Sequence, residues 1–373
     1  MKAGEFKKIA DALARFATTR ETATGPTSLI GVQSTNGNLK LISGETTAAM
    51  VVTVPEFNGI KEDIKWTIPA RPLLQAAKVL PARHEITINV EADRLQLLTE
   101  GGGSVDIGRS AVPLREVGWP RKPRVFRASG RIDAINLKRM SKLFKNISAK
   151  VQVPSVRIIK DTGYAITVAP GVGAMYANYR FPAESVNGPD DEYNMAAYRE
   201  FWEALTHFQD DGTLQWGRDG VLCRAGDYEC YSAPYLVAKY DKKTGTSEAP
   251  REQDPWPIMV AIEQSDVALT IMRKTLTEVI KGQAPFDDLN RITLEVTTGS
   301  VRVMPFGSND GMDVPCEATG KGIRSVNADY LLTLLNAMDS KEVTLRWSGG
   351  VPAISISSED YSSWTILLAP ITF

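Results

Sequence analysis

The feature that most constrains the fold is an internal repetition of domain size. Ala70, Ala197 and Ala328 occupy equivalent positions near the start of three segments with helical apolar spacing, and they lie about 130 residues apart. Solenoid repeats are only about 20 to 50 residues long, whereas a copy of this length can enclose a core of its own. The 373-residue sequence therefore predicts three domains, which we place at residues 1–119, 120–251 and 252–373.

Each copy repeats one order of elements. The first helices are predicted at residues 5–18, 132–147 and 265–282, and the second helices at 68–80, 195–205 and 326–338. Three runs of alternating apolar and polar residues follow each helix, as in an antiparallel sheet with one buried face. The predicted fold class is α+β, with two amphipathic helices packed on the antiparallel sheet of each domain.

The distribution of charge points to a polyanionic partner although the net charge is only −1. Residues 119–150 contain ten Lys or Arg and a single acid, Asp133. Lys138, Lys142 and Lys145 share one face of their predicted helix. Lys8 with Arg15, and Lys274 with Lys281, do the same in the equivalent helices. One such row is typical of a solvated face, but its recurrence favours a surface that faces phosphates.

Several classes of function are disfavoured by what the sequence lacks. Cys223, Cys230 and Cys316 show no CxxC spacing, and the two histidines are far apart, so neither a disulfide framework nor a metal site is expected. There is no GxSxG, P-loop, HExxH or strand-linked GxGxxG pattern, which predicts a protein without enzymatic activity and without a cofactor. No apolar run is long enough for a membrane span, and a cytoplasmic location is expected. An enzyme of unknown class stays open as an alternative.

Three stretches carry a resemblance that covers essentially the whole chain. They are residues 67–74 (TIPARPLL) with 79–81 (VLP), residues 326–332 (VNADYLL), and the end of the chain at 367–373 (LLAPITF). In this order and spacing the chain resembles the bacterial beta-type sliding clamp, the processivity factor of the replicative polymerase. The resemblance implies a head-to-tail homodimer of six domains, closed as a ring with helices lining the hole and sheets forming the outer wall.

The same resemblance implies the partners and the mode of action. Double-stranded DNA would be held without sequence readout because it is enclosed, and a DNA polymerase and a clamp loader would bind the ring. Arg71 and Lys78 match basic positions of the family's helix. A polymerase accessory protein that does not encircle DNA is the alternative. The predicted DNA-facing residues are Lys8, Arg15, Arg20, Arg71, Lys78, Lys138, Arg139, Lys142, Lys145, Arg273, Lys274 and Lys281.

A pocket for apolar peptides between the second and third domains is also implied. Its matching positions are Val168, Gly171, Ala174, Met175, Leu236, Val237, Leu368, Pro370, Ile371 and Phe373. From the pattern alone the apolar C-terminal end can equally be a core strand, and both readings stay open. Residues 170–175 (PGVGAM) depart from the family's Thr-Asp-Gly-His-Arg-Leu run, and Thr372 replaces a basic residue. These departures predict a less polar pocket, which is compatible with a divergent, phage-encoded clamp.

Overall fold

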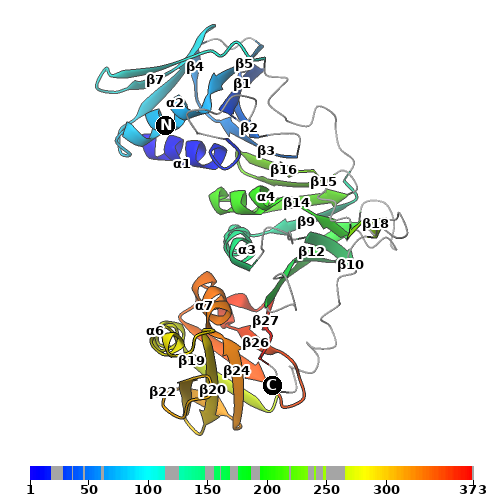
Figure 1. Ribbon diagram of the computed structural model, residues 1–373. Coiled ribbons are helices and arrows are strands. Elements are labelled where there is room, and N and C mark those ends of the chain that lie inside the picture. Colours follow the sequence, from blue (N-terminus) through cyan, green and yellow to red (C-terminus); the bar gives the residue numbers. More distant parts are fainter. Residues whose placement is uncertain are drawn as a thin grey trace. The chain divides into compact units, whose positions relative to one another are not determined.

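Figure 1 shows the computed structural model of the chain. The described residues are 1–17, 28–35, 37–44, 47–59, 63–113, 126–147, 155–159, 161–168, 175–185, 194–217, 220–233, 239–240, 247–248 and 265–371. They form two compact units. The first unit takes in Met1–Ser141, Val156–Thr162 and Pro182–Tyr235, and the second takes in Lys142–Ser155, Gly163–Phe181 and Leu236–Phe373. The predicted domain boundaries after residues 119 and 251 fall outside the described residues and stay predictions.

The first unit is built on an antiparallel sheet that continues from one sequence repeat into the next. The strands β5 and β1 to β3 belong to the first repeat, and β3 pairs along five residues with β16 of the second repeat. In sheet order the strands are β5 (Ile64–Pro69), β1 (Leu29–Thr35), β2 (Asn38–Gly44), β3 (Ala48–Val54), β16 (Tyr228–Ser232), β15 (Gly220–Ala225), β14 (Gly212–Gly217) and β9 (Ala128–Ile132).

Two smaller groups of strands complete the first unit. A four-stranded sheet contains β4 (Asn58–Gly59), β6 (Ile86–Val90), β7 (Arg94–Thr99) and β8 (Ser104–Gly108). The short strand β13 (Asn194–Ala196) pairs with β10 (Ser155–Ile159).

Helices cover one face of the long sheet. α1 (Ala3–Leu13) and α2 (Ala70–Val79) lie side by side, and α1 contacts β3. α4 (Arg199–Ala204), continued by the short helix η3 (Leu205–His207), contacts β16 and β3 on the same face (Figure 1). The helices turn apolar residues toward the strands, among them Phe6, Leu13, Leu73 and Phe201, all fully buried.

The second unit repeats this arrangement. Its third-repeat helices α6 (Arg273–Gln283) and α7 (Ala328–Ala337) lie side by side, and the unit also includes the end of α3 from Lys142 to Ile147. One sheet contains, in order, β23 (Glu317–Thr319), β19 (Val267–Met272), β25 (Glu342–Trp347), β26 (Ile354–Ser357), β27 (Trp364–Leu368) and β12 (Met175–Ser185). The other contains β22 (Met312–Pro315), β21 (Ser300–Pro305), β20 (Arg291–Thr297) and β24 (Gly322–Asn327).

A few short elements lie between these sheets and helices. β11 (Thr162–Val168) precedes β12, whose last residues, 183–185, pair with β9. η4 (Ala284–Phe286) follows α6, and η5 (Glu359–Tyr361) precedes β27. Two further short strands, β17 (Lys239–Tyr240) and β18 (Ser247–Glu248), form an antiparallel pair. The predicted α+β class with antiparallel sheets is thus confirmed.

Two of the predicted first helices begin too early. α3 (Ala134–Ile147) starts after Asp133, whose carboxylate accepts a hydrogen bond from the backbone N–H of Asn136 at 2.8 Å and so caps the helix. Ile132, predicted as the first residue of this helix, instead ends β9, and Ile135 within α3 is 59% exposed. The buried stripe of α3 runs through Leu137, Met140, Leu143, Phe144 and Ile147.

The start of the third repeat is likewise a strand rather than a helix. Val267 and Ile271, predicted to lie on a helix, are buried residues of β19, where burial alternates along the strand. All six residues of β19 pair with β25, and a period of two fits a strand better than a helix. The helix α6 begins only at Arg273, where Leu276 and Ile280 form its buried face.

Candidate nucleic-acid interface and partner site

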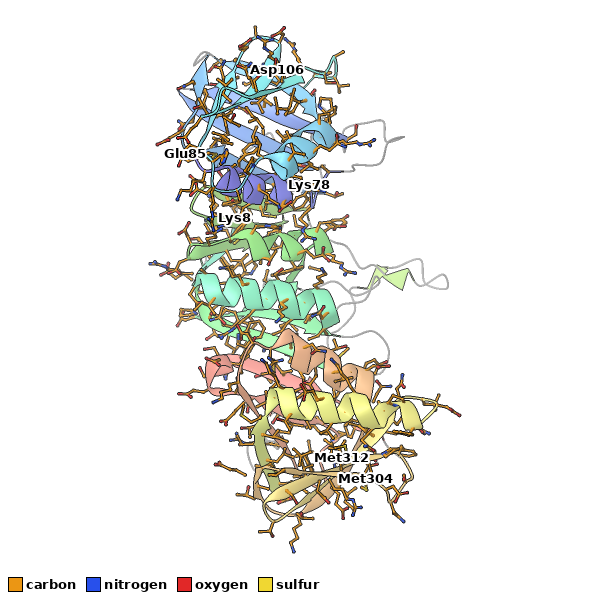
Figure 2. All side chains as sticks on the ribbon, turned by 90° about the vertical axis from the view of Figure 1, so that its left-hand side faces the viewer. Lys8, Lys78, Glu85, Asp106, Met304 and Met312 are labelled. Carbon is orange, nitrogen blue, oxygen red and sulfur yellow. The ribbon has the colours of Figure 1, made fainter. Side chains whose placement is uncertain are left out.

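The cations of the first repeat lie on α1 and α2. Lys8 and Arg15 are exposed on α1 and in the turn after it, and Lys78 is exposed in the last turn of α2. Figure 2 labels Lys8 and Lys78 on the two neighbouring helices. Arg71 is partly exposed in the first turn of α2. Arg20 lies outside the described residues.

Arg15 is engaged with a side chain of the second repeat. Its Nε donates a hydrogen bond to Nε2 of His207 in η3 over 3.4 Å. Burial of the half-buried imidazole lowers the pKa of His207, and the Arg15 charge lowers it further, against a smaller opposing effect of Asp11. The geometry requires a neutral imidazole with its proton on Nδ1, because a protonated Nε2 cannot accept.

The second repeat presents its cations on α3. Lys138, Lys142 and Lys145 are exposed, and none of them makes an ion pair with any described residue. Arg139 is partly exposed. The opposite face of α3 is buried, and Phe144 packs edge-on against Trp364 with ring centroids 6.4 Å apart. The helix is therefore anchored on one face and free to offer the lysines on the other.

In the third repeat, Arg273 differs from its neighbours. Lys274 and Lys281 are exposed on α6. The Arg273 guanidinium instead donates through Nε to the carbonyl of Ser340 at 2.7 Å and through a terminal nitrogen to the carbonyl of Leu335 at 3.1 Å. These carbonyls lie at the C-terminal end of α7, so Arg273 joins α6 to α7. Its predicted role toward DNA is thus combined with a structural one.

Two residues of the predicted partner pocket lie at the seam between β12 and β27. Met175 and Leu368 are directly opposite each other in this antiparallel pairing, and both are buried. Pro370 and Ile371 are partly exposed, and the Ile371 N–H donates to the carbonyl of Ser325 in β24 at 2.8 Å. The apolar C-terminal end is thus a core strand up to Leu368 and continues as a tail held against β24.

Of the remaining predicted pocket residues, the structure describes only Val168. Val168 is the last residue of β11. Gly171, Ala174, Leu236, Val237 and Phe373 lie outside the described residues.

A cluster on the other face of this seam escaped the sequence prediction. Tyr176 and Leu367 are register partners one step along from Met175 and Leu368, and they form a buried apolar group with Ile166. Ala353 belongs to the same group, and Tyr164 and Val351 pack against it. The alternation of side chains along a strand could have predicted this group, because the residue next to one that faces the core points to the opposite face of the sheet.

Metal-binding chemistry finds no support in the described part of the chain. No group of three His, Cys, Asp or Glu side chains there is placed to hold a metal ion. Cys223 and Cys230 are register partners in β15 and β16, and burial raises the pKa of both thiols. Buried thiols with raised pKa values are poor nucleophiles. Among the described helices, none combines the length and hydropathy needed to span a membrane.

Solved structures share this fold over the whole chain. A DnaN sliding clamp (DNA polymerase III subunit beta) from Pseudomonas aeruginosa, bound to griselimycin, is 16% identical with a TM-score of 0.73, covering 100% of this chain and 98% of that one. The DNA polymerase III beta subunit from Thermotoga maritima is 15% identical with a TM-score of 0.72 and the same coverage. A putative DNA polymerase III beta subunit from Eubacterium rectale is 13% identical, with a TM-score of 0.69, covering 100% and 98%. No family model and no curated protein sequence matches the chain.

Proposed function

We propose that this chain, which has the fold of the bacterial DNA polymerase III beta subunits, is a DNA sliding clamp without enzymatic activity. Two chains close head to tail into a ring of six domains around duplex DNA, and the ring tethers a replicative polymerase. The observation that supports this proposal most is a shared fold that covers all of this chain and nearly all of each neighbour.

Ring closure is supported by how the strand edges are used. The pairings of β3 with β16 and of β12 with β27 join strands of consecutive repeats into continuous sheets. Among the described strands, β8 pairs only with β7 and β22 only with β21, so both are edge strands, as β4 and β24 are at the other edges of the same two sheets. Pairing β8 of one chain with β22 of another would remove both edges, in a head-to-tail closure.

Exposed apolar side chains lie beside the open edge of the third repeat. Phe286 is 75% exposed at the end of η4, Leu289 is 63% exposed, and Met312 on β22 is 49% exposed. Figure 2 labels Met312 on this edge strand and Asp106 on β8. Both η4 and β22 contact β21, whereas the carbonyl of Leu289, which follows η4, accepts a hydrogen bond from the side chain of Asn327 in β24 at 3.5 Å. Burial against a second copy would remove them from water.

The cationic helix surfaces suit a protein that must slide along a duplex. Lysines on helices attract phosphates without reading base edges, because the interaction is electrostatic and independent of sequence. Enclosure then keeps the protein on DNA while the contacts stay weak. The proposed DNA-facing set remains the one predicted from the sequence. Its exposed members among the described residues are Lys8, Arg15, Lys78, Lys138, Lys142, Lys145, Lys274 and Lys281.

Polymerase and clamp loader are proposed to dock at the β12–β27 seam. The tail formed by Ala369, Pro370 and Ile371 is partly exposed there, next to the apolar group around Leu367. An apolar peptide segment is the partner that such a surface accepts. Docking near the tail leaves the core pairing of Met175 with Leu368 undisturbed.

Primer extension on a primed circular template tests the tethering role. The replicative polymerase and clamp loader encoded in the same genome are supplied with or without this chain. We expect longer products from each binding event with the same rate of nucleotide insertion, because a clamp changes dissociation rather than chemistry. Products of unchanged length would contradict the proposal.

A further inference from the structure

The first helices of the three repeats carry their cations in different surroundings. On α1 and the turn after it, Asp11 lies between Lys8 and Arg15 on one face, and all three are exposed. On α6, Glu278 takes the same place between Lys274 and Lys281. The sequence of α3 (AINLKRMSKLFKNI) contains no acid at all.

The row on α3 is consequently the most cationic of the three. Lys138, Lys142 and Lys145 stand at i, i+4 and i+7 and extend over about 10 Å of helix, since each residue adds about 1.5 Å. The corresponding rows of α1 and α6 each hold two cations around one acid. A neighbouring carboxylate within one turn reduces the attraction of a lysine for phosphate.

Several arginines on or near these helices are engaged elsewhere, whereas Lys78 on α2 is exposed. Arg15 donates to His207, and Arg273 donates to two carbonyls at the end of α7. On α4, Arg199 pairs with Glu203 at 2.7 Å. The sequence of α7 (ADYLLTLLNA) contains neither lysine nor arginine.

We infer that the lysine row of α3 is the principal phosphate-contacting track of this chain, so that attraction to DNA is concentrated on the second repeat. This inference rests on the proposed function. A homodimer carries two such tracks, related by its twofold axis. Lysines suit this task because each is a flexible, hydrated point charge that can exchange one phosphate for the next.

The salt dependence of DNA binding tests the inference against a matched control. The triple variant Lys138→Ala, Lys142→Ala and Lys145→Ala removes the α3 track. The control Lys8→Ala, Lys274→Ala and Lys281→Ala removes the same charge from α1 and α6. Affinity for a short linear duplex is measured by fluorescence anisotropy at salt concentrations from about 50 to 200 mM.

The expected results differ between the two triple variants. Each lost phosphate contact lowers the slope of log affinity against log salt by about 0.9, so the α3 variant should lose about 2 to 3 units of slope. The control should lose less than about one. Equal losses in both variants, or no loss in the α3 variant, would overturn the inference. The single change Lys142→Gln, expected to lower the slope by about 0.9, keeps the test open should the triple variant unfold.

A separate measurement distinguishes this inference from the proposed function. Wild-type protein is loaded on nicked circular DNA, and its retention is followed. If the wild type is retained but the slopes show no preference for α3, only the track assignment fails. If the wild type leaves circles as fast as linear DNA, the clamp function itself fails.

Discussion

Arg15 and His207 meet although 192 residues separate them in the sequence. Their contact joins the turn after α1 to η3 of the following repeat, within one compact unit. Since the imidazole must be neutral to accept from Arg15, protonation of His207 breaks the hydrogen bond and places two cations together. The charged groups that act on His207 are Arg15 and Asp11, both from the first repeat.

This contact predicts a pH dependence of stability. The pKa of His207 is lower in the fold than its ordinary value of about 6.5, so its stabilising contribution is complete above that value. The contribution is lost as pH falls through the lower, folded-state pKa. The variant His207→Gln keeps an acceptor without titrating, and its denaturation midpoint should fall less between about pH 7.5 and 5.5 than that of the wild type. His84→Gln, at an exposed histidine, is the control and should behave as wild type.

At the scale of elements, Arg273 holds the start of α6 to the C-terminal end of α7. Replacing it with alanine leaves the carbonyls of Leu335 and Ser340 without their donor. We expect Arg273→Ala to lower the free energy of unfolding by about 1 to 3 kcal/mol, as measured by urea denaturation. The neighbouring change Lys274→Ala removes an equal charge from an exposed site and should stay within about 0.5 kcal/mol of wild type. Equal effects of the two changes on the free energy of unfolding would contradict the role of Arg273 as a donor to the carbonyls at the end of α7.

The C-terminal tail is the element proposed to bind partner proteins. Deleting residues 370–373 removes the segment that Ile371 fastens to β24, but it spares the pairing of β27 with β12. We expect polymerase binding, measured by surface plasmon resonance, to fall at least tenfold while the solution mass is unchanged. As a control, Ile323→Ala on the neighbouring strand removes an exposed apolar side chain and should leave binding intact. Wild-type affinity in the truncated protein would refute the assignment.

Most individual elements could be predicted from the periodicity of apolar residues, because this spacing is visible within the short sequence of a single helix or strand. The strands β1, β2 and β3 and the helix α7 lie where alternation and helical spacing put them. The prediction went wrong at β19, where a short apolar run of Val267, Leu269 and Ile271 precedes a helix and was merged with it. The strands β5 and β24, which lie in the same position before α2 and α7, were missed for the same reason.

The site could be predicted less well because its contacts are long-range. Exposure of Lys138 and Lys142 followed from helical spacing. The hydrogen bonds of Arg273 and Arg15 could not be predicted in this way, since their partners come from distant parts of the chain. Likewise, the pairing register that puts Met175 opposite Leu368, and so turns Leu367 to the other face, depends on a strand almost two hundred residues away.

For the whole molecule, the proposed closure makes the third repeat's open end an interface. Phe286 and Leu289 are expected to be buried between two copies, so the double change Phe286→Asp and Leu289→Asp should yield monomers. Sedimentation equilibrium should then give the 40.8 kDa of one chain, against twice that mass for the wild type. Ile323→Asp, at another apolar residue more than half exposed, should leave the dimer intact. A wild type that is monomeric at micromolar concentration would contradict the closure.

The most direct test of the central claim is retention on closed and open DNA. The protein is loaded on nicked circular DNA, excess protein is removed in high salt, and the bound fraction is followed before and after a restriction enzyme cuts the circle. A ring that encircles DNA should stay on the circle and leave within seconds to minutes of the cut, because it slides off the ends. Equal dissociation from circular and linear DNA would contradict enclosure and with it the proposed function.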